Sequence, residues 1–537
     1  MQLTNKFNVE KGYDIGNAFA AGISPENIAA NMDIISIQRK LSIKEIKQII
    51  DNIFDEQELY TLANTILDLD YLTITQQRTI LRNIAVRCDL SLDELMWNCE
   101  QNATDNLREL RNKWYQILGD ELSISLYIIN IIGQDNIIYT DNSFYIFNLN
   151  RWESKEDREI KQIIISQTKH LRVLKSKIDS ILDIMKSRLY NQNIKFNQDI
   201  LDLTFKNLYL KWDTNNFISS QPTKTTYNTI YFDINYDPYA TAPRFEKFLQ
   251  EIFYYDEDKD DKINLLLEMI GYTLIKDCFL ERFFILVGSG CNGKSVFLNV
   301  IKSLLGNRNC SSVSMQSLSN KFQKAQLNGR LANIVAEISE GEKLPDEEIK
   351  ALSSGEIMTI EKKFINPIEC KPFATLIFAT NHLPYNKDYS DAIYRRIIPV
   401  TFNRTFKPDE IDPNLSKELE SEIPGIFNLV ISALINLLRR ESFIVPASST
   451  KATEDWKFNN DHIKQFLEDC CKVGGGIIVS KLVYERYLKW CSDNGINTKY
   501  NRNNFTNRLY HFGVKPKRGV NGVRMLSNIM LLANHSE

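Results

Sequence analysis

The strongest constraint on this chain is a short glycine-rich segment with the pattern Gly-x-x-x-x-Gly-Lys-Ser, which spans residues 288–295. An apolar run, 283–287, precedes it, and a helix-like segment, 296–305, follows it. A glycine-rich turn between a strand and a helix directs backbone N–H groups and the positive end of the helix toward phosphate oxygens. The segment therefore predicts an α/β domain that binds a nucleoside triphosphate.

The residues of this segment have distinct expected roles. Lys294 is expected to reach the β- and γ-phosphates, and the hydroxyl of Ser295 is expected to coordinate Mg²⁺. The glycines let the backbone approach the phosphates without an intervening side chain. The predicted nucleotide contacts are Gly288, Ser289, Gly290, Cys291, Asn292, Gly293, Lys294 and Ser295.

Length and composition set the frame for the other predictions. The 537 residues suffice for about three or four domains, and 43% hydrophobic with 25% charged residues is ordinary for a globular protein. Because the net charge is -3, contact with nucleic acid must come from local basic patches. The nine cysteines lack the spacing of a disulfide framework or a zinc site. With no secretion signal and no run of 18 apolar residues, we expect a cytoplasmic protein without membrane contact.

Changes of pattern along the chain divide it into parts. Residues 41–118 show apolar positions at helical spacing and contain no glycine, which predicts an all-helical region. A hairpin is expected around the Asp141-Asn142 turn. The Ser/Thr/Pro-containing stretch 445–453 is interpreted as a linker. The predicted domains are a helical one at 1–118, a mixed α+β and helical one at 119–280, the nucleotide-binding core at 281–445 and a C-terminal one at 455–537.

Two apolar strands after the glycine-rich segment end in polar residues. The first, 330–337, ends in Glu337, which we predict to serve Mg²⁺ and the attacking water, with Glu340 as a candidate second acid. The second, 373–380, is followed by Asn381. An amide at that strand end is suited to contact the γ-phosphate or to orient water.

A pair of arginines, Arg395 and Arg396, stands just before a further apolar run, 397–400. Adjacent arginines are usually solvated. After this series of strands, however, they occupy the place of an arginine finger that reaches the nucleotide of a neighbouring subunit. Such a finger typically contributes ~10³–10⁵ in rate, and either arginine suits the role.

The order of these motifs resembles the superfamily 3 helicase domain, in the branch of phage/plasmid and poxvirus-type primase-helicases. The layout is also similar to that of replication-initiator helicases of bacterial mobile elements such as pathogenicity islands. The resemblance covers about residues 120–530 and is densest in 283–400. The segments that carry it are Gly288–Ser295, Asn328–Arg330 with Glu337, Lys350–Glu356, Ala379–Pro384 and Tyr394–Arg396.

This resemblance implies a multidomain α/β chain with an AAA+-like P-loop ATPase core, ATP and Mg²⁺ as cofactors, and a hexameric ring. It implies that Glu337 is the hydrolytic acid, Asn381 the γ-phosphate sensor, and Arg395 or Arg396 the finger that acts in trans. It also implies a hairpin between about 350 and 366 that projects into the pore, with DNA contacts at Lys350, Lys362 and Lys363. Ala336 stands where many members have a second acid, which leaves the second Mg²⁺ ligand unassigned.

The C-terminal segment is strongly basic. Between Asn494 and Ser536 there are seven Lys or Arg residues and no Asp or Glu, which favours binding to a polyanion. A helix-like stretch, 503–512, precedes a basic hairpin around Asn521-Gly522. This pattern is typical of a winged-helix domain, with a solvated basic surface as the alternative. The predicted DNA contacts are Arg502, Arg508, Lys515, Lys517, Arg518 and Arg524.

Together these features predict an ATP-driven, ring-forming replicative DNA helicase and replication initiator that moves single-stranded DNA through a central pore. The alternative is an ATPase switch that binds a double-stranded origin and recruits a separate helicase. A packaging motor is disfavoured, because no nuclease-like carboxylate cluster follows the ATPase motifs. Asp68 and Asp70 lie in the helical region without a nearby histidine, so we expect primase activity to be absent and a separate primase or other replication proteins to act as partners.

Overall fold

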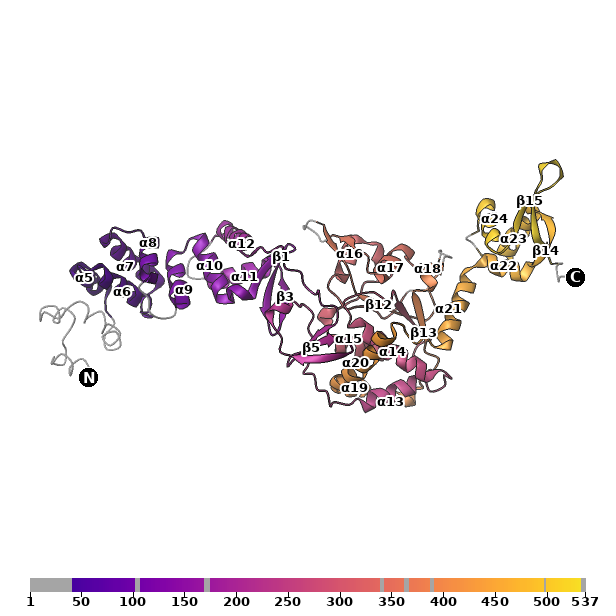
Figure 1. Cartoon of the computed structure of the whole chain (residues 1–537), viewed down its shortest axis with the longest axis horizontal. Coiled ribbons are helices and arrows are strands. Elements are labelled where there is room, and N and C mark those ends of the chain that lie inside the picture. The colour runs from indigo at the N-terminus through magenta and orange to yellow at the C-terminus, as the bar shows by residue number, and fades with distance from the viewer. Residues whose placement is uncertain are drawn as a thin grey trace. The chain divides into compact units, whose positions relative to one another are not determined.

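The structure is a computed structural model that describes residues 41–101, 107–168, 174–338, 342–361, 367–386, 391–496 and 499–532. The chain separates into two compact units, Met1–Phe196 and Asn197–Glu537 (Figure 1). The boundary at 196 falls inside the predicted domain 119–280. The multidomain α/β class and the helical N-terminal region are confirmed, whereas the four-domain division stays a prediction.

The described part of the first unit begins with a helical bundle around a core that includes the fully buried Trp114. Capping boxes begin two of its helices, with Ser42 paired to Glu45 and Thr73 paired to Gln76. These boxes satisfy backbone N–H groups that have no partner within the helix. The helices are α5 (Ile43–Asn52), α6 (Glu56–Leu67), α7 (Ile74–Arg87), α8 (Leu92–Gln101) and α9 (Leu107–Leu118).

The second half of this unit combines helices with a small antiparallel sheet of order β1-β2-β3. The predicted hairpin is confirmed, because Thr140 pairs with Ser143 across a turn in which Asp141 and Asn142 have φ of 48° and 57°. Asp and Asn tolerate this left-handed region better than most residues. The elements are α10 (Glu121–Ile132), β1 (Ile137–Thr140), β2 (Ser143–Asn148), β3 (Arg151–Lys155), α11 (Asp157–Gln167) and α12 (Lys175–Leu189).

A five-stranded parallel sheet organises the second unit, with the order β13-β7-β12-β9-β8. Its strands are β7 (Phe283–Val287), β8 (Cys310–Ser311), β9 (Ala332–Val335), β12 (Thr375–Thr380) and β13 (Ile397–Thr401). The first strand of this sheet in sequence, β7, therefore lies inside the sheet, between β12 and the edge strand β13. Strands buried on both faces explain the nearly continuous apolar runs in the sequence.

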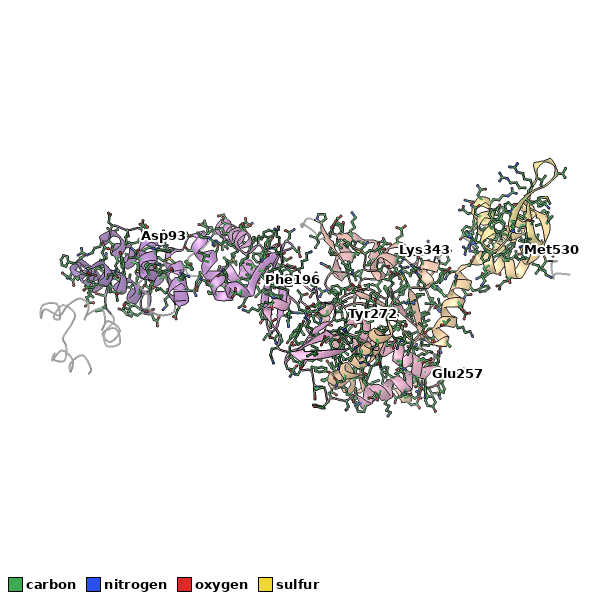
Figure 2. The ribbon with its side chains drawn as sticks, in the orientation of Figure 1. Asp93, Phe196, Glu257, Tyr272, Lys343 and Met530 are labelled. Atoms are coloured by element: carbon green, nitrogen blue, oxygen red, sulfur yellow. The ribbon has the colours of Figure 1, made fainter. Side chains whose placement is uncertain are left out.

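Helices cover both faces of this sheet (Figure 1). Side chains of β7 alternate, so that Phe284 and Leu286 enter one core while Phe283 and Ile285 enter the other. The first core also contains the fully buried Tyr272, which lies deep in this unit (Figure 2). Helices of the first core are α13 (Pro243–Ile252), α14 (Lys259–Thr273), α15 (Lys294–Leu305), α19 (Leu415–Ser421) and α20 (Ile423–Arg440); those of the second are α17 (Asp346–Ser353), α18 (Asp391–Tyr394) and α21 (Ala447–Asn460).

Smaller elements surround the parallel sheet. One antiparallel sheet has the order β4-β5-β6, and a two-stranded hairpin joins β10 to β11. The elements are β4 (Asp202–Thr204), β5 (Tyr209–Asp213), β6 (Asn216–Ser220), β10 (Met358–Ile360), β11 (Ile368–Cys370) and the short helix α16 (Lys321–Lys324).

The C-terminal part combines three helices with an antiparallel sheet of order β14-β16-β15. The predicted basic hairpin is confirmed, because β15 pairs with β16 from Lys515↔Ser527 to Arg518↔Arg524. The strand β14 was not predicted, since Gly474, Gly475 and Gly476 in its middle argue against a strand. The elements are α22 (His462–Cys470), β14 (Cys471–Val479), α23 (Ser480–Asp493), α24 (Arg502–His511), β15 (Lys515–Arg518) and β16 (Arg524–Leu531).

The expected linker 445–453 is wrong, because most of it belongs to helix α21. This helix is fixed by Trp456, which is buried in the second core and donates from its ring nitrogen to the carbonyl of Pro384 at 2.8 Å. The start of this helix is rich in Ser and Thr, and this composition concealed the few buried contacts that define the helix.

Among the described residues, α20 is the one helix that is long and apolar enough to cross a membrane. Its apolar side chains include Ile426, Val430 and Leu434, which belong to the first core of the sheet. Gly271 of α14 allows close packing here, because a Cβ atom on it would lie 3.0 Å from the Cβ of Leu434. A core helix of a globular fold accounts for this composition.

Candidate nucleotide site and nucleic-acid interface

The glycine-rich segment connects strand β7 to helix α15, as predicted. Its beginning is fixed to the neighbouring strand, because the Gly288 N–H donates to the Thr380 carbonyl at 3.1 Å. Its end has Gly293 at φ 85°, a conformation that favours glycine. The N–H groups at the start of α15 therefore face the open end of the sheet, where an anion is favoured.

Lys294 is folded back onto the loop that precedes it. Its ammonium group donates to the carbonyl of Gly288 and, at 3.1 Å, to the side-chain oxygen of Asn292. Burial lowers the pKa of Lys294 below its ordinary value. The lysine thus stands directly beside the loop, and a phosphate group would supply the counter-charge that these neutral partners do not.

Glu337 and Asn381 reach the same edge of the sheet as the loop. Val287 of β7 is level with Thr380 of β12, and Asn381 follows directly. Phe378 is level with Val335 of β9, and the Ile338 N–H donates to the Ala379 carbonyl at 3.0 Å. Because parallel strands end at one edge, the two predicted residues lie at the carboxyl end beside the loop.

The polar groups of this edge are open to a ligand. Ser295, Glu337 and Asn381 are exposed, and none of them has a side-chain hydrogen bond to a residue that the structure describes. A Cβ atom on Gly290 would meet nothing within 4 Å, so the space in front of the loop is free. The residues present therefore fit a triphosphate together with Mg²⁺, and Ser295 and Glu337 would hold the Mg²⁺.

Glu340, the candidate second acid, lies outside the described residues. Among the residues that the structure describes, no group of three or more His, Cys, Asp and Glu side chains is suited to a metal.

The two arginines differ sharply in their surroundings. Arg396 is buried and donates to Glu281 at 2.7 Å, to the hydroxyl of Ser354 at 2.8 Å and to the carbonyl of Ala392 at 2.9 Å. The side chain of Arg395 is 66% exposed and lies 4.0 Å from Glu281. The sequence did not distinguish which arginine would be the finger. In this geometry Arg395 is the one whose guanidinium is exposed and can contact a neighbouring subunit.

The arginines lie at the opposite edge of the sheet from the glycine-rich loop. Arg396 directly precedes β13, and its carbonyl accepts from the N–H of Phe283, the first residue of β7. The five residues of β13 separate this edge from the other by roughly 16 Å at about 3.3 Å per residue. Arg395 is therefore poorly placed to reach a nucleotide on its own loop.

The predicted pore hairpin corresponds to β10 and β11, which pair from Met358↔Cys370 to Ile360↔Ile368. The predicted DNA contacts Lys362 and Lys363 lie outside the described residues. Lys350 lies earlier, in the last turn of α17, and is half-buried. Glu361, which directly follows β10, forms an ion pair with Lys321 of α16 at 2.9 Å.

The predicted C-terminal DNA contacts fall into two groups. Arg508 is 2.7 Å from the carboxylate of Asp461, which also caps α22, so the charge of Arg508 is already paired inside the domain. The other five residues are exposed and form no ion pair with a residue that the structure describes. These five are Arg502, Lys515, Lys517, Arg518 and Arg524.

Sequence reasoning missed a segment that lies beside the glycine-rich loop, Phe402–Phe406. The Phe402 N–H donates to the Val287 carbonyl at 2.7 Å, and the Phe406 N–H donates to the Cys291 carbonyl at 2.7 Å. These are backbone contacts, which residue types do not reveal. The one available signal was its position directly after the apolar run of β13.

Cys291 offers a direct reporter for this site. It is the one exposed cysteine of the nine, and it lies in the middle of the loop. We expect a thiol reagent to modify Cys291 first, and ATP with Mg²⁺ to slow that modification by at least about tenfold when the nucleotide is near-saturating. Peptide mass mapping after timed alkylation measures this rate. Equal rates with and without nucleotide would contradict a ligand on the loop.

Three sequence families match separate parts of the chain. Residues 120–254 match the family described as D5 N terminal like, and residues 459–518 match the Poxvirus D5 protein-like family. Residues 286–396, which contain the glycine-rich loop, Glu337 and Asn381, match a family of unknown function (DUF5906).

Two viral proteins are similar in sequence. "Putative helicase L207/L206" of Acanthamoeba polyphaga mimivirus is 24% identical over 44% of this chain and 28% of its own length. "Putative helicase 184R" of Invertebrate iridescent virus 6 is 23% identical over 65% of this chain and 41% of its own length. The chain thus spans less than half the length of either relative. The chain is therefore similar in two of its parts to D5-like proteins and, over a longer stretch, to viral proteins named as putative helicases.

Among solved structures, the apo A form of the NrS-1 C-terminal region is similar over 75% of this chain and 99% of its own length. The TM-score is 0.43 and the sequence identity is 13%.

Proposed function

We propose that this protein is an ATP-driven replicative DNA helicase of superfamily 3, which forms a ring and moves single-stranded DNA through its central pore. The family matches support the general class of replication helicase. The ring, the translocation and the initiator role are our extension of that class. In this proposal the D5-type chain hydrolyses ATP at the Gly288–Ser295 loop with Mg²⁺ and uses the energy to move along DNA.

The observation that carries this proposal is the division of polar residues between the two edges of one sheet. The loop, Glu337 and Asn381 lie at the carboxyl edge, while Arg395 lies at the amino edge. A single copy therefore holds a phosphate-binding site without its arginine, and a free arginine without a phosphate. Stacking of copies around a ring would bring the Arg395 of one against the nucleotide of the next.

Each residue then has a role that needs no covalent chemistry. When bound, Mg²⁺ neutralises charge that develops on the phosphates. Lys294 binds the phosphate chain, Glu337 orients and deprotonates the attacking water, and Asn381 contacts the γ-phosphate. The exposed guanidinium of Arg395 stabilises negative charge on the transferred phosphoryl group of the neighbouring copy.

The C-terminal part is proposed to be a winged-helix domain that binds double-stranded DNA, with α24 in a groove and the β15–β16 hairpin on the backbone. We propose that this domain recognises a replication origin, as in initiator helicases of mobile elements. Its exposed basic residues support contact with phosphates. A cytoplasmic location and partnership with a separate primase are parts of the same proposal.

The test is unwinding of a forked DNA duplex by the purified full chain with ATP and Mg²⁺. The proposal predicts strand separation that stops when ATP is replaced by a non-hydrolysable analogue. Hydrolysis of ATP together with origin binding, but without strand separation, would favour the alternative of an ATPase switch that recruits a separate helicase.

Neutralising the basic hairpin tests the DNA-binding part. The full chain with Lys515, Lys517, Arg518 and Arg524 changed to alanine should bind duplex DNA more weakly, and the slope of log K against log salt should fall by about 3 to 4, since each phosphate contact contributes about 0.9. Fluorescence anisotropy at several salt concentrations measures the slope.

A matched variant removes four exposed lysines elsewhere, at Lys44, Lys47, Lys417 and Lys451. It loses the same total charge and should keep the slope of the unmodified protein. Equal effects of the two variants would mean that the hairpin is a solvated basic surface with no special contact to DNA.

A further inference from the structure

The segment Phe402–Phe406 is held tightly against the glycine-rich loop. It leaves the carboxyl end of β13, and its two end residues donate backbone hydrogen bonds to Val287 and Cys291 at 2.7 Å each. A Cβ atom on Gly288 would lie 2.6 Å from the Phe402 carbonyl oxygen, so a side chain at this position would push the segment away. The segment is therefore part of the wall of the nucleotide site.

Arg404, in the middle of this segment, joins it to the end of helix α13. Its guanidinium donates to the Glu251 carbonyl and to the Glu410 carboxylate, both at 2.8 Å. Its central carbon lies 4.3 Å from the centre of the Phe406 ring and 5.8 and 5.9 Å from those of Tyr254 and Tyr255. A guanidinium attracts aromatic faces at these separations, so Arg404 fixes the positions of the rings.

Tyr254 and Tyr255 are nevertheless open to solvent, with exposed fractions of 66% and 72%. Their ring centres are 5.1 Å apart. Helix α13 ends just before them at Ile252, whose methyl group would lie 2.7 Å from a Cβ atom on Gly293 of the loop. Glu257, which is close in sequence, lies at the outer margin of this unit (Figure 2). Two exposed aromatic rings are thus held near the loop, and neither ring belongs to the hydrophobic core of this unit.

The order of strands gives the direction in which a bound nucleotide extends. Glu337 and Asn381 follow β9 and β12, which lie on one side of β7. The reacting γ-phosphate therefore belongs on that side. Since the triphosphate is a linear chain, its ribose and base extend to the other side of β7, where β13, Arg404 and the tyrosines lie.

We infer that Tyr254 and Tyr255 are a stacking surface for the nucleobase of the bound nucleoside triphosphate, held in position by Arg404. This inference rests on the proposed nucleotide site but not on helicase activity. A purine offers the larger face for stacking. Loss of base–aromatic stacking weakens binding by about 5- to 150-fold per base, whereas the phosphate contacts are unaffected.

Calorimetric binding of ATP and of inorganic tripolyphosphate to the full chain tests this inference without requiring hydrolysis. The double change Tyr254→Ala and Tyr255→Ala should raise the Kd for ATP with Mg²⁺ about tenfold or more and change the Kd for tripolyphosphate less than twofold. Tyr239→Ala is the matched control, since Tyr239 is 89% exposed and belongs to the same unit. It should leave both affinities unchanged.

Arg404→Lys separates positioning from a merely structural role. Lysine keeps the charge but neither stacks on the rings nor makes both hydrogen bonds. The Kd for ATP should therefore rise relative to the Kd for tripolyphosphate, as in the double tyrosine variant. Equal weakening of ATP and tripolyphosphate would overturn the inference, because the residues would then only support the loop. An unchanged Kd for ATP with reduced affinity for single-stranded DNA would also overturn it and assign the rings to DNA. Failure to unwind DNA, with the base-dependent shift intact, would refute the proposed function alone.

Discussion

Replacing Arg395 by alanine is expected to lower ATP hydrolysis by ~10³–10⁵ while leaving ATP binding and folding nearly unchanged. The side chain is 66% exposed and its guanidinium lies 4.0 Å from the carboxylate of Glu281, so its removal costs little stability. The loss of rate arises because the arginine stabilises charge on a nucleotide that a neighbouring copy holds. Steady-state hydrolysis and calorimetric ATP binding measure the two effects.

Mixing experiments test whether Arg395 acts between copies. An Arg395→Ala chain retains its own loop, and a Lys294→Ala chain retains its arginine. A mixture should therefore regain hydrolysis, because some interfaces combine an intact loop with an intact arginine. Absence of rescue at every mixing ratio would contradict action in trans.

The neighbouring Arg396 supplies an internal contrast. Its hydrogen bonds to Glu281, Ser354 and Ala392 join the amino edge of the sheet to the end of α17. Arg396→Ala should therefore lower the free energy of unfolding by about 1–3 kcal/mol, visible as a lower Tm. The folded fraction of Arg396→Ala keeps both its loop and Arg395. Mixing this variant with Lys294→Ala is therefore not expected to raise ATP hydrolysis above what that folded fraction supplies.

Replacing Lys294 by alanine is expected to reduce ATP hydrolysis by about 100-fold or more. The ammonium group is held beside the loop by Gly288 and Asn292, so the charge is already in position when phosphate arrives. The fold should persist, because the lost hydrogen bonds are made to neutral acceptors within the loop itself. Hydrolysis assays, with circular dichroism to verify folding, check this expectation.

Lys302→Ala is the matched control, since Lys302 belongs to the last turn of the same helix, away from the loop. It should retain hydrolysis within about twofold of the unmodified chain, as is usual for a surface change. Full activity in Lys294→Ala would remove the nucleotide site from this loop.

Local patterns predicted much of the fold correctly. The segment 283–305 specifies a strand, a turn and a helix through its own residues, and the structure has these three elements at β7, the loop and α15. The hairpins at Asp141-Asn142 and at 515–531 are likewise encoded by their turn residues and alternating strands. Such features depend on residues that are close in sequence, so a single amino-acid sequence is enough to predict them.

Features that depend on distant residues were not predictable in the same way. The difference between Arg395 and Arg396 is set by Glu281 and Ser354, which are far from them in sequence. Helix α21 depends on the burial of Trp456 against Pro384, and its Ser/Thr-rich start suggested a linker instead. The arrangement of Arg404, Tyr254 and Tyr255 joins segments about 150 residues apart through a backbone carbonyl, which leaves no pattern in the sequence.

ATP hydrolysis and particle mass, measured on one preparation with and without single-stranded DNA, test whether the chain is a ring-forming motor. We expect assemblies of several copies whose hydrolysis rate rises when the oligonucleotide is added. A particle that stays monomeric at every concentration, with a hydrolysis rate that is the same with and without DNA, would contradict this expectation.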